Sequence, residues 1–411
     1  MQKKWIAQIG LLLIVPIVVM LSWSTPAWAF SEEQRLVNEV WRIVNRSYVD
    51  ESFNHQNWRS LRQQVLSRPL NNREAAYETI QQMLASLNDP FTRLLRPDQY
   101  RSLQTNTSGE LTGVGLQIAL DPETSELKVI APLESSPAEQ AGIRPADRIS
   151  RIDGISTAKL TLDEAAKRMR GPIGSRVILT VAREGEPELD ILVVRDRIAI
   201  NPVYAQLRKL PERPPIGYIR LNQFNANATV ELAKAVHRLE DQGAEGYILD
   251  LRNNPGGLLQ AGVEIARLWL DSGTIVYTVN RQGIQDSFEA NGPALTQDPL
   301  VVLVNQGTAS ASEILAGALQ DNGRAELVGE KTFGKGLIQS LFELSDGSGL
   351  AVTVAKYETP NHQDINKLGI TPDRIVPLEA ITREQVATEQ DQQYQAAVEL
   401  LTQRSVLAGA A

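Results

Sequence analysis

The stretch that decides the fold of the C-terminal half is Gly307-Thr308-Ala309-Ser310-Ala311-Ser312-Glu313-Ile314-Leu315-Ala316-Gly317-Ala318-Leu319. The residues before it, Pro299-Leu300-Val301-Val302-Leu303-Val304, form a continuous apolar run that predicts a buried strand. The small and aliphatic residues after Ser310 predict a buried helix. A strand, a tight turn of small residues and a helix form the geometry that exposes a nucleophilic serine at a helix N-terminus. Ser310 is therefore the candidate nucleophile.

A second segment supplies a candidate base for this serine. It reads Gly329-Glu330-Lys331-Thr332-Phe333-Gly334-Lys335-Gly336-Leu337-Ile338-Gln339, with Lys335 between two glycines. A serine with a lysine base is a known variant of the catalytic triad. Lysine can accept a proton only when it is neutral, and burial or a nearby positive helix end would lower its pKa. The flanking glycines and apolar neighbours predict such a close, apolar setting for Lys335.

Acyl transfer also requires N–H donors for the developing oxyanion. Because Ser310 begins a predicted helix, the next amide, that of Ala311, is one candidate donor. A second buried strand is predicted at 247–251, and the loop after it contains Gly256. Since glycine has no side chain, the Gly256 amide could approach a substrate carbonyl closely. We take it as the second candidate donor.

One alternative for the lysine segment is a phosphate-binding loop. Residues 329–335 match that motif up to its last position, where Gly336 replaces the required serine or threonine. The motif must also open a helix, whereas residues 337–342 read as a strand. We therefore reject nucleotide binding.

Composition limits the classes of function. The chain has 411 residues and 42% hydrophobic residues, which predicts two or three domains with real cores. Its net charge of −8 argues against non-specific binding of nucleic acid. The absence of cysteine excludes disulfides, cysteine-ligated metals and thiol catalysis. The three histidines are scattered without metal-ligand spacing, so we expect no metal and no cofactor.

The N-terminus predicts a signal peptide over residues 1–29. Lys3 and Lys4 form a basic region, an apolar run covers 9–21, and Ala27-Trp28-Ala29 offers small residues at a cleavage site. An uncleaved anchor is the alternative, but the run is shorter than the roughly 20 residues that span a membrane. We expect an exported protein that is soluble or peripheral on a membrane.

The rest of the chain divides into four regions by pattern. Residues 30–105 predict helices, and residues 106–197 predict a compact, strand-rich domain. Residues 198–378 alternate strands and helices, which predicts an α/β layer structure. A helical segment is expected over 379–411. The predicted fold class is therefore α/β multidomain, with an inserted β-rich domain and a helical N-terminal region.

The strand-rich region resembles a PDZ domain of the bacterial protease-associated type. The resemblance is carried by Gly113-Val114-Gly115-Leu116, Ser136-Pro137-Ala138, Ala141-Gly142 and Asp147-Arg148-Ile149. It departs from the family at Ala146, where glycine is usual. PDZ domains add a peptide C-terminus as an edge strand and hold its carboxylate on loop amides. The resemblance implies that Gly113, Val114, Gly115 and Leu116 bind the end of a protein tail.

Taken together, the motifs resemble the carboxyl-terminal processing proteases, the tail-specific Ser/Lys peptidases. The core motif runs from Thr308 to Glu313 and continues with Gly334-Lys335-Gly336 and Gln339. The resemblance covers nearly all of the chain after residue 29, in the same order of domains. It implies a catalytic domain of the crotonase and Clp-protease type, with no cofactor. Its substrate would be a protein with a free C-terminus.

The same resemblance assigns roles to particular residues. Ser312 is a rival nucleophile by position, but the family spacing to the lysine favours Ser310. A family arginine that precedes Gly-x-x-Gly in the PDZ domain falls on Arg170, as a switch residue that binds substrate. The other implied roles are nucleophile for Ser310, base for Lys335, lysine-orienting amide for Gln339, and oxyanion donors for Gly256 and Ala311.

The segment Tyr357–Ile365 lacks the glycine that commonly follows Pro360 and resembles the photosynthetic branch of the family. That resemblance implies a lumenal substrate, the precursor of the photosystem II reaction-centre protein, whose trimming allows the manganese cluster to assemble. It also leaves open a role for His362 beside the structural one usual for a loop histidine.

Several alternatives stay open at this point. The chain could be a general tail-specific protease of the periplasm or lumen, a catalytically silent PDZ protein that binds tails, or an acyl-thioester enzyme. The PDZ region and the export signal argue against the last. Monomer or homodimer, and contact with a membrane surface, are also undecided.

Overall fold

The computed structural model describes residues 30–409, except for 122–123, 134, 184, 212 and 378–380. The predicted signal peptide therefore lies outside the described residues. The described chain forms two compact units. The first holds the residues up to Arg96 together with Leu341–Val352, and the second holds Pro97–Ser340 and the residues from Thr353 onward.

The first unit is mainly helical. Its elements are α2 (Glu32–Ser47), α3 (Trp58–Leu66), α4 (Arg73–Ala85) and β1 (Arg93–Leu95). Ser31, Asn57 and Asn72 cap the three helices, each accepting a hydrogen bond from a backbone N–H of the first turn. β1 pairs antiparallel with residues 349–351, at the start of β18 (Gly349–Glu358). The predicted helical N-terminal region is confirmed.

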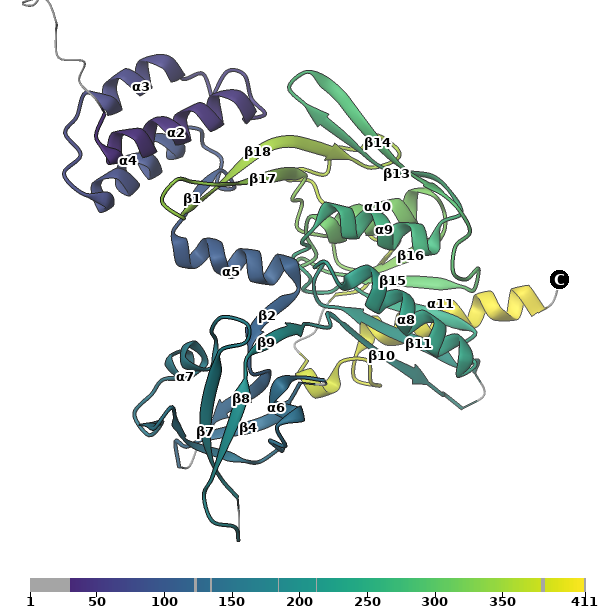
Figure 1. Ribbon diagram of the computed structural model, residues 1–411. Coiled ribbons are helices and arrows are strands. Elements are labelled where there is room, and N and C mark those ends of the chain that lie inside the picture. The colour runs from purple at the N-terminus through teal and green to yellow at the C-terminus, as the bar shows by residue number, and fades with distance from the viewer. Residues whose placement is uncertain are drawn as a thin grey trace, which may run out of the picture. The chain divides into compact units, whose positions relative to one another are not determined.

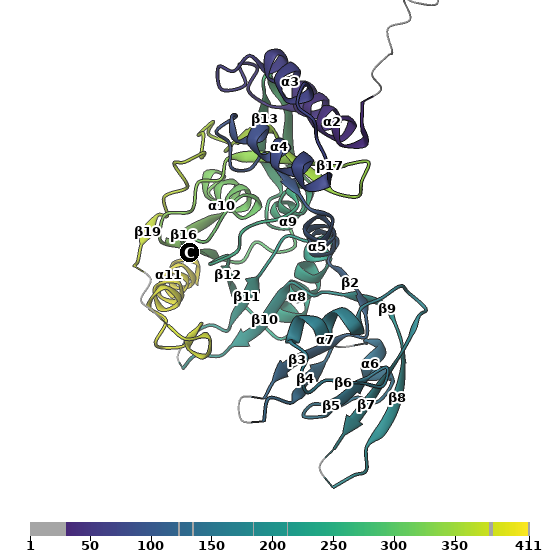
Figure 2. The same ribbon diagram turned by 90° about the vertical axis from the view of Figure 1, so that its left-hand side faces the viewer.

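The second unit opens with α5 (Pro97–Ser108) and continues into the PDZ domain (Figure 2). The order in its main sheet is β3-β4-β5-β7-β8, with β6 paired to β5, so β3 is an edge strand. Val129 and Val177 each lie between two exposed neighbours and form the core of the domain together with Ile149 and Leu179. The elements of the domain are β3 (Leu116–Leu120), β4 (Leu127–Pro132), α6 (Pro137–Gln140), β5 (Arg148–Ile152), β6 (Ile155–Ser156), α7 (Leu162–Met169), β7 (Arg176–Ala182) and β8 (Leu189–Val194).

A short ladder joins the PDZ domain to the catalytic domain. β2 (Glu110–Gly113) enters the PDZ domain and β9 (Asp196–Ala199) leaves it, and the two strands pair antiparallel. The side-chain amide of Asn227 donates to the carbonyl of Gly109, at 2.8 Å. The PDZ domain is therefore an insertion whose two ends meet beside the catalytic domain.

The catalytic domain is built on a six-stranded sheet with the order β10-β11-β12-β15-β16-β19. Figure 1 labels four of these strands, β10, β11, β15 and β16. All pairs in it are parallel except β10 with β11. β12 and β15 are buried along their whole length, which explains their continuous apolar sequence. The strands are β10 (Val203–Arg208), β11 (Ile216–Leu221), β12 (Gly246–Asp250), β15 (Leu300–Val304), β16 (Ala325–Gly329) and β19 (Arg374–Ile375).

Helices cover both faces of this sheet. Tyr247 and Leu249 face one core together with α8 (Ala228–Asp241), α9 (Leu259–Trp269) and α10 (Ala311–Asp321). Ile248, on the opposite face of the same strand, packs in a second core with Tyr394 of α11 (Gln392–Gly409). The predicted α/β layer structure is confirmed.

Three more strands complete the second unit. β13 (Ser272–Asn280) forms a hairpin with β14 (Gly283–Asn291) and pairs with residues 356–358 at the end of β18. β17 (Leu337–Glu343) is the strand predicted directly after the lysine segment. A phosphate-binding loop must lead into a helix, whereas the lysine segment leads into this strand. Within the described residues, no helix combines the length and apolar character needed to cross a membrane.

Candidate active site

Ser310 occupies a strained turn between β15 and α10. It is the N-cap residue of α10, with φ of 58° and ψ of −119°. A positive φ is unfavourable for a residue with a Cβ, and such strain persists mainly at functional sites. Ser310 is only half-buried, whereas every residue from Ala311 to Leu319 is buried. The turn therefore presents this one side chain at the edge of a packed helix.

The buried carboxylate of Glu313 joins the serine turn to the lysine segment. Its Oε2 accepts hydrogen bonds from the backbone N–H groups of Ser310 and Lys335, both at 2.9 Å. Its Oε1 accepts from the Thr332 hydroxyl at 2.6 Å and from the Gly334 N–H at 2.7 Å. Hydrogen bonds to a charged acceptor are stronger than neutral ones. One side chain thus holds the backbones of both candidate catalytic residues.

Glu313 was not singled out from the sequence, although a signal was present. Ser310 and Glu313 are spaced as Ser-x-x-Glu before an apolar helix, which is the pattern of a capping box. That pattern predicts the bond from the Ser310 N–H to the Glu313 carboxylate. It contains no information about the lysine segment, whose bonds to Glu313 join residues 19 to 22 positions apart.

Tyr357 of β18 makes a second connection between the same two segments. Its hydroxyl donates toward the carbonyl oxygens of Ser310, at 3.1 Å, and of Lys335. Its backbone N–H donates to the Gly336 carbonyl at 3.1 Å. Burial, and then the charge of Glu313, raise the pKa of Tyr357 well above its usual value. The hydroxyl therefore stays protonated and remains a donor.

The glycines around Lys335 allow two segments to pack closely. A Cβ on Gly336 would lie 2.6 Å from the backbone nitrogen of Asn366, and Gly334 has φ of 86°. Lys335 itself is half-buried. Gln339 lies on β17, and its Nε2 is buried without a hydrogen-bond partner among the described residues.

Gly256 contacts the serine turn directly. With φ of 91°, its backbone is so close that a Cβ would lie 2.6 Å from the Ala309 carbonyl oxygen and 2.8 Å from the Ala311 nitrogen. The Gly256 N–H, however, donates to Asn254 Oδ1 within the same loop, at 2.9 Å. In the described part of the chain, no hydrogen bond is found for the N–H groups of Ala311 and Gly257. Gly257 was not considered from the sequence, because a glycine pair does not show which amide points outward.

The rival serine occupies a different environment. Ser312 is 0% exposed, and its hydroxyl donates to the Asn254 carbonyl at 3.0 Å. That bond links the start of α10 to the Gly256 loop. Ser312 is thus placed as a structural residue, while Ser310 reaches the surface.

His362 lies on the surface of the same unit. Its ring stacks on Tyr277 at 4.3 Å between centroids and lies 3.0 Å from a carboxylate oxygen of Glu358. Tyr277 lies on β13, and Glu358 lies on β18, the strand that pairs with β13. The observed contacts account for His362 as a structural residue of this loop.

A buried charge network supports the loop that carries Gly256. The Arg252 guanidinium pairs with Asp250 at 2.7 Å and with Asp391 at 2.8 Å, and all three are almost fully buried. Burial by itself would raise the pKa of Asp391, but the hydrogen bonds and charge of Arg252 lower it below its usual value. The network ties the residues before α11 to the end of β12.

The PDZ loop turns sharply next to Ser136. Val114 is buried, while Gly115 has φ of 77° and lies so close to Ser136 that a Cβ would clash. The loop leads directly into the edge strand β3. Gly113 lies close to the backbone of Arg170. Arg170 is exposed and is the C-cap residue of α7.

Arg195 is a further buried residue of the PDZ domain that the sequence did not indicate. Its guanidinium donates to the carbonyls of Arg168 and Met169, at 2.8 and 2.9 Å, where α7 ends. Cations stabilise the C-terminal end of a helix. Arg195 therefore holds the end of α7 beside the glycine loop.

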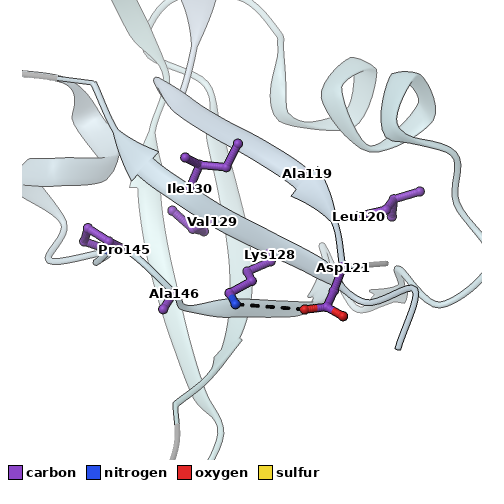
Figure 3. Close-up of a pocket in the computed structure, with 8 residues that line it drawn as sticks. All are labelled: Ala119, Leu120, Asp121, Lys128, Val129, Ile130, Pro145 and Ala146. Atoms are coloured by element: carbon purple, nitrogen blue, oxygen red, sulfur yellow. Dashed lines mark ion pairs between the residues drawn. The ribbon is translucent and has the colours of Figure 1, made fainter. Parts of the chain in front are cut away.

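The PDZ domain also contains a hollow of about 420 Å³, shown in Figure 3. Apolar side chains of β3, β4 and the Pro145-Ala146 turn line it, and an ion pair of 3.9 Å joins Lys128 to Asp121 at its edge. None of the predicted binding residues lines this hollow. Within the described residues, no cluster of histidine and acidic side chains could hold a metal ion.

The described site has the parts of a serine peptidase: a serine on a strained turn at a helix start, a nearby lysine segment and free backbone amides. Comparison with known proteins assigns the class. Residues 215–376 match the model of peptidase family S41, and residues 128–183 match a PDZ domain model. Both matches lie inside the domains that the fold defines.

Relatives that match most of this chain identify the family more specifically. A carboxyl-terminal-processing protease from Synechocystis sp. is 61% identical over 391 residues, which cover 95% of this chain and 92% of that protein. A chloroplastic carboxyl-terminal-processing peptidase of Arabidopsis thaliana is 47% identical, covering 90% of this chain and 74% of that protein. A solved structure of a photosystem II D1 C-terminal processing protease is 43% identical with a TM-score of 0.55, covering 84% of this chain and 94% of that chain.

The chain belongs to the carboxyl-terminal-processing proteases of peptidase family S41. It is a serine peptidase of the Ser/Lys type that acts on protein C-termini. The predictions of enzyme class and of a PDZ-containing α/β fold are confirmed. The assignment of individual residues to catalytic steps stays a proposal.

Proposed function

We propose that Ser310 is the nucleophile and Lys335 the general base of an endopeptidase that removes a C-terminal extension from a protein. The observation that carries this proposal is the Glu313 carboxylate, which binds the backbone N–H groups of Ser310 and Lys335 at the same time. A pair held on one buried carboxylate keeps a constant backbone separation. Such positioning is what a serine with a lysine base requires.

The chemical steps follow from these positions. The neutral Lys335 amine takes the Ser310 hydroxyl proton while Oγ bonds to the scissile carbonyl carbon. The carbonyl oxygen becomes an oxyanion, the C–N bond then breaks, and the Lys335 ammonium returns the proton to the leaving amine. Water repeats the sequence on the acyl-enzyme with the same base and releases the shortened protein. Gln339, on the neighbouring strand β17, would orient the lysine through its side-chain amide.

The oxyanion would be held by backbone amides beside Ser310. The Ala311 N–H lies at the N-terminus of α10, where the helix dipole favours negative charge. Gly256 is the second proposed donor, but its N–H would first have to leave Asn254 Oδ1. The adjacent Gly257 N–H, which has no partner in the described residues, is an alternative second donor.

The PDZ domain would select the substrate by its end. A tail that pairs with the edge strand β3 would bring its carboxylate to the amides of Gly113, Val114, Gly115 and Leu116. The Arg170 side chain, next to this loop, would add a positive charge for that carboxylate. The domain would thereby distinguish a free C-terminus from internal sequence.

We further propose that the substrate is the precursor of the photosystem II D1 protein. The support is the 43% identity to a protease named for that activity, together with the cyanobacterial and chloroplastic relatives. The same relatives support an enzyme of a lumen or periplasm. The proposal that it is exported, and soluble or peripheral on a membrane, rests on the N-terminal sequence. A monomer and a homodimer are both compatible with this function.

Cleavage of defined tails tests these assignments. The purified protein and its Ser310→Ala and Lys335→Ala variants are incubated with a D1 precursor tail peptide and with unrelated peptides ending in apolar residues, and products are read by mass. Matched controls are Ser156→Ala and Lys159→Ala, because these exposed PDZ residues repeat a serine and a lysine in close spacing. We expect both catalytic-site variants to lose activity while both controls keep it.

The pattern of cleavage separates the alternatives. Cleavage of the D1 tail alone would establish a dedicated processing enzyme, and equal cleavage of all tails would establish general tail-specific proteolysis. Full activity of either catalytic-site variant would refute the assignment of that residue. Binding of tails without any cleavage would favour the silent tail-binding protein.

A further inference from the structure

The Tyr357 hydroxyl contacts the backbones of both proposed catalytic residues. It lies near the end of β18 and is 1% exposed. Its hydroxyl donates toward the Ser310 carbonyl at 3.1 Å and toward the Lys335 carbonyl. β18 is separate in sequence from both the serine turn and the lysine segment, so the phenol is an anchor from a third segment of the chain.

The contacts of Tyr357 complement those of Glu313. Glu313 binds the N–H groups of Ser310 and Lys335, whereas Tyr357 binds the carbonyl oxygens of the same two residues. The phenol has one proton, which it shares between the two carbonyl oxygens, so the same pair of buried side chains contacts each of the two residues on its N–H and on its carbonyl side. Because the N–H and the carbonyl of one residue belong to the two peptide groups on either side of its Cα, the two side chains together act on both of these groups.

We propose that Tyr357 is a positioning residue that sets the distance between the Ser310 hydroxyl and the Lys335 amine. This inference rests on the proposed roles of these two residues and goes beyond them, because the Tyr357 hydroxyl is bonded to backbone carbonyl oxygens. Tyr357 acts by holding the carbonyl groups of Ser310 and Lys335. The distance between the backbones that carry the serine and lysine side chains is then constant. A displacement of about 1 Å in such a pair can cost about 100-fold in rate.

The variant that tests the proposal is Tyr357→Phe, which keeps the ring and removes only the hydroxyl. Matched controls are Tyr247→Phe and Tyr394→Phe, because these buried hydroxyls have no hydrogen-bond partner in the described residues. We expect kcat to fall at least about tenfold in Tyr357→Phe with KM within about twofold. The two controls should keep the kcat of the parent protein.

Two readouts separate positioning from a general structural role. The first readout is labelling of the serine by a fluorophosphonate, which requires the activated hydroxyl but no binding of a protein tail. In this reaction the Oγ–P bond forms, fluoride leaves and the hydroxyl proton passes to the base. The labelling rate should fall in Tyr357→Phe in parallel with kcat. The acidic limb of the kcat/KM profile should also move to higher pH, because a less confined lysine is better hydrated and hydration favours the ammonium form.

A rescue variant completes the design. Site-specific 3-fluorotyrosine at position 357 keeps the hydroxyl and should restore labelling to near the parent rate. Parent labelling by Tyr357→Phe would overturn the inference and leave the proposed function intact. Loss of the fold in Tyr357→Phe, seen by circular dichroism, would also overturn it, since the hydroxyl would then be structural. Labelling that persists in Ser310→Ala would instead remove the proposed nucleophile.

Discussion

Replacing Glu313 by glutamine should separate the serine from the lysine while changing only a few atoms. The carboxylate accepts four hydrogen bonds, from the N–H groups of Ser310, Gly334 and Lys335 and from the Thr332 hydroxyl, at 2.6 to 2.9 Å. A glutamine amide has one oxygen and one NH2 group. In either orientation the NH2 group replaces one carboxylate oxygen, and each of those oxygens accepts two of the four hydrogen bonds. Two bonds are therefore lost, and at least one of them becomes a contact between two N–H donors.

The magnitude follows from these lost bonds. A hydrogen bond to a charged group contributes about 1.5–3 kcal/mol, so two of them amount to about 3–6 kcal/mol. At 2–4 °C per kcal/mol for a domain of this size, Tm should fall by roughly 10 °C. Because the Ser310 and Lys335 backbones are no longer tied together, kcat should fall about 100-fold, with little change in KM.

Scanning calorimetry and tail-peptide kinetics measure the two effects on the same preparations. Glu245→Gln is the control, because this exposed glutamate has no side-chain hydrogen bond in the described structure. It should match the parent protein in both assays. If Glu313→Gln kept the parent Tm and kcat, the four hydrogen bonds would not hold the site together, and the reasoning would be wrong.

Two further predictions concern the neighbouring loops. Breaking the pair of Asp391 with Arg252 by Asp391→Asn should cost about 3–5 kcal/mol at pH 7. Because Arg252 lowers the pKa of Asp391, this stabilisation is fully present above the ordinary carboxyl pKa near 4 and is lost as the pH falls through the lower folded pKa. Urea unfolding of parent and variant should therefore converge as the pH falls below that ordinary value. Gly256→Ala should lower kcat about 100-fold, since the new Cβ would lie 2.6 Å from the Ala309 carbonyl and displace the serine turn. Gly243 has a similar positive φ of 87° but open space around it, so Gly243→Ala is the control and should keep the kcat of the parent protein. Equal kcat in the two variants would refute the steric argument.

Much of the fold was predictable because its signals are local. The buried strand before Ser310 and the helix after it follow from an apolar run and a stretch of small residues, and the structure has β15 and α10 there. The strand after Lys335 was predicted from residues 337–342 and is β17. Such patterns depend on neighbours within one element, so a single sequence contains them.

The details of the site depend on contacts between distant segments. Ser312 and Ser310 are equivalent by local pattern, yet one hydroxyl is buried on the Asn254 carbonyl and the other is at the edge of the helix. Gly256 was predicted as an amide donor, but its N–H is bonded to Asn254. No spacing rule shows which hydroxyl or which amide turns outward, because that depends on how two loops pack.

The sequence by itself determined the enzyme class, since a serine at a helix start, a lysine between glycines and a PDZ-like loop are each recognisable from neighbouring residues. Only the tertiary structure showed what brings them together. Glu313 binds the N–H groups of Ser310 and Lys335, and Tyr357 contacts the carbonyl groups of the same two residues. These contacts join three segments of the chain. The physical reason is that backbone N–H and carbonyl groups are identical at every position. Which of them meet a buried carboxylate or phenol is decided only when the segments pack.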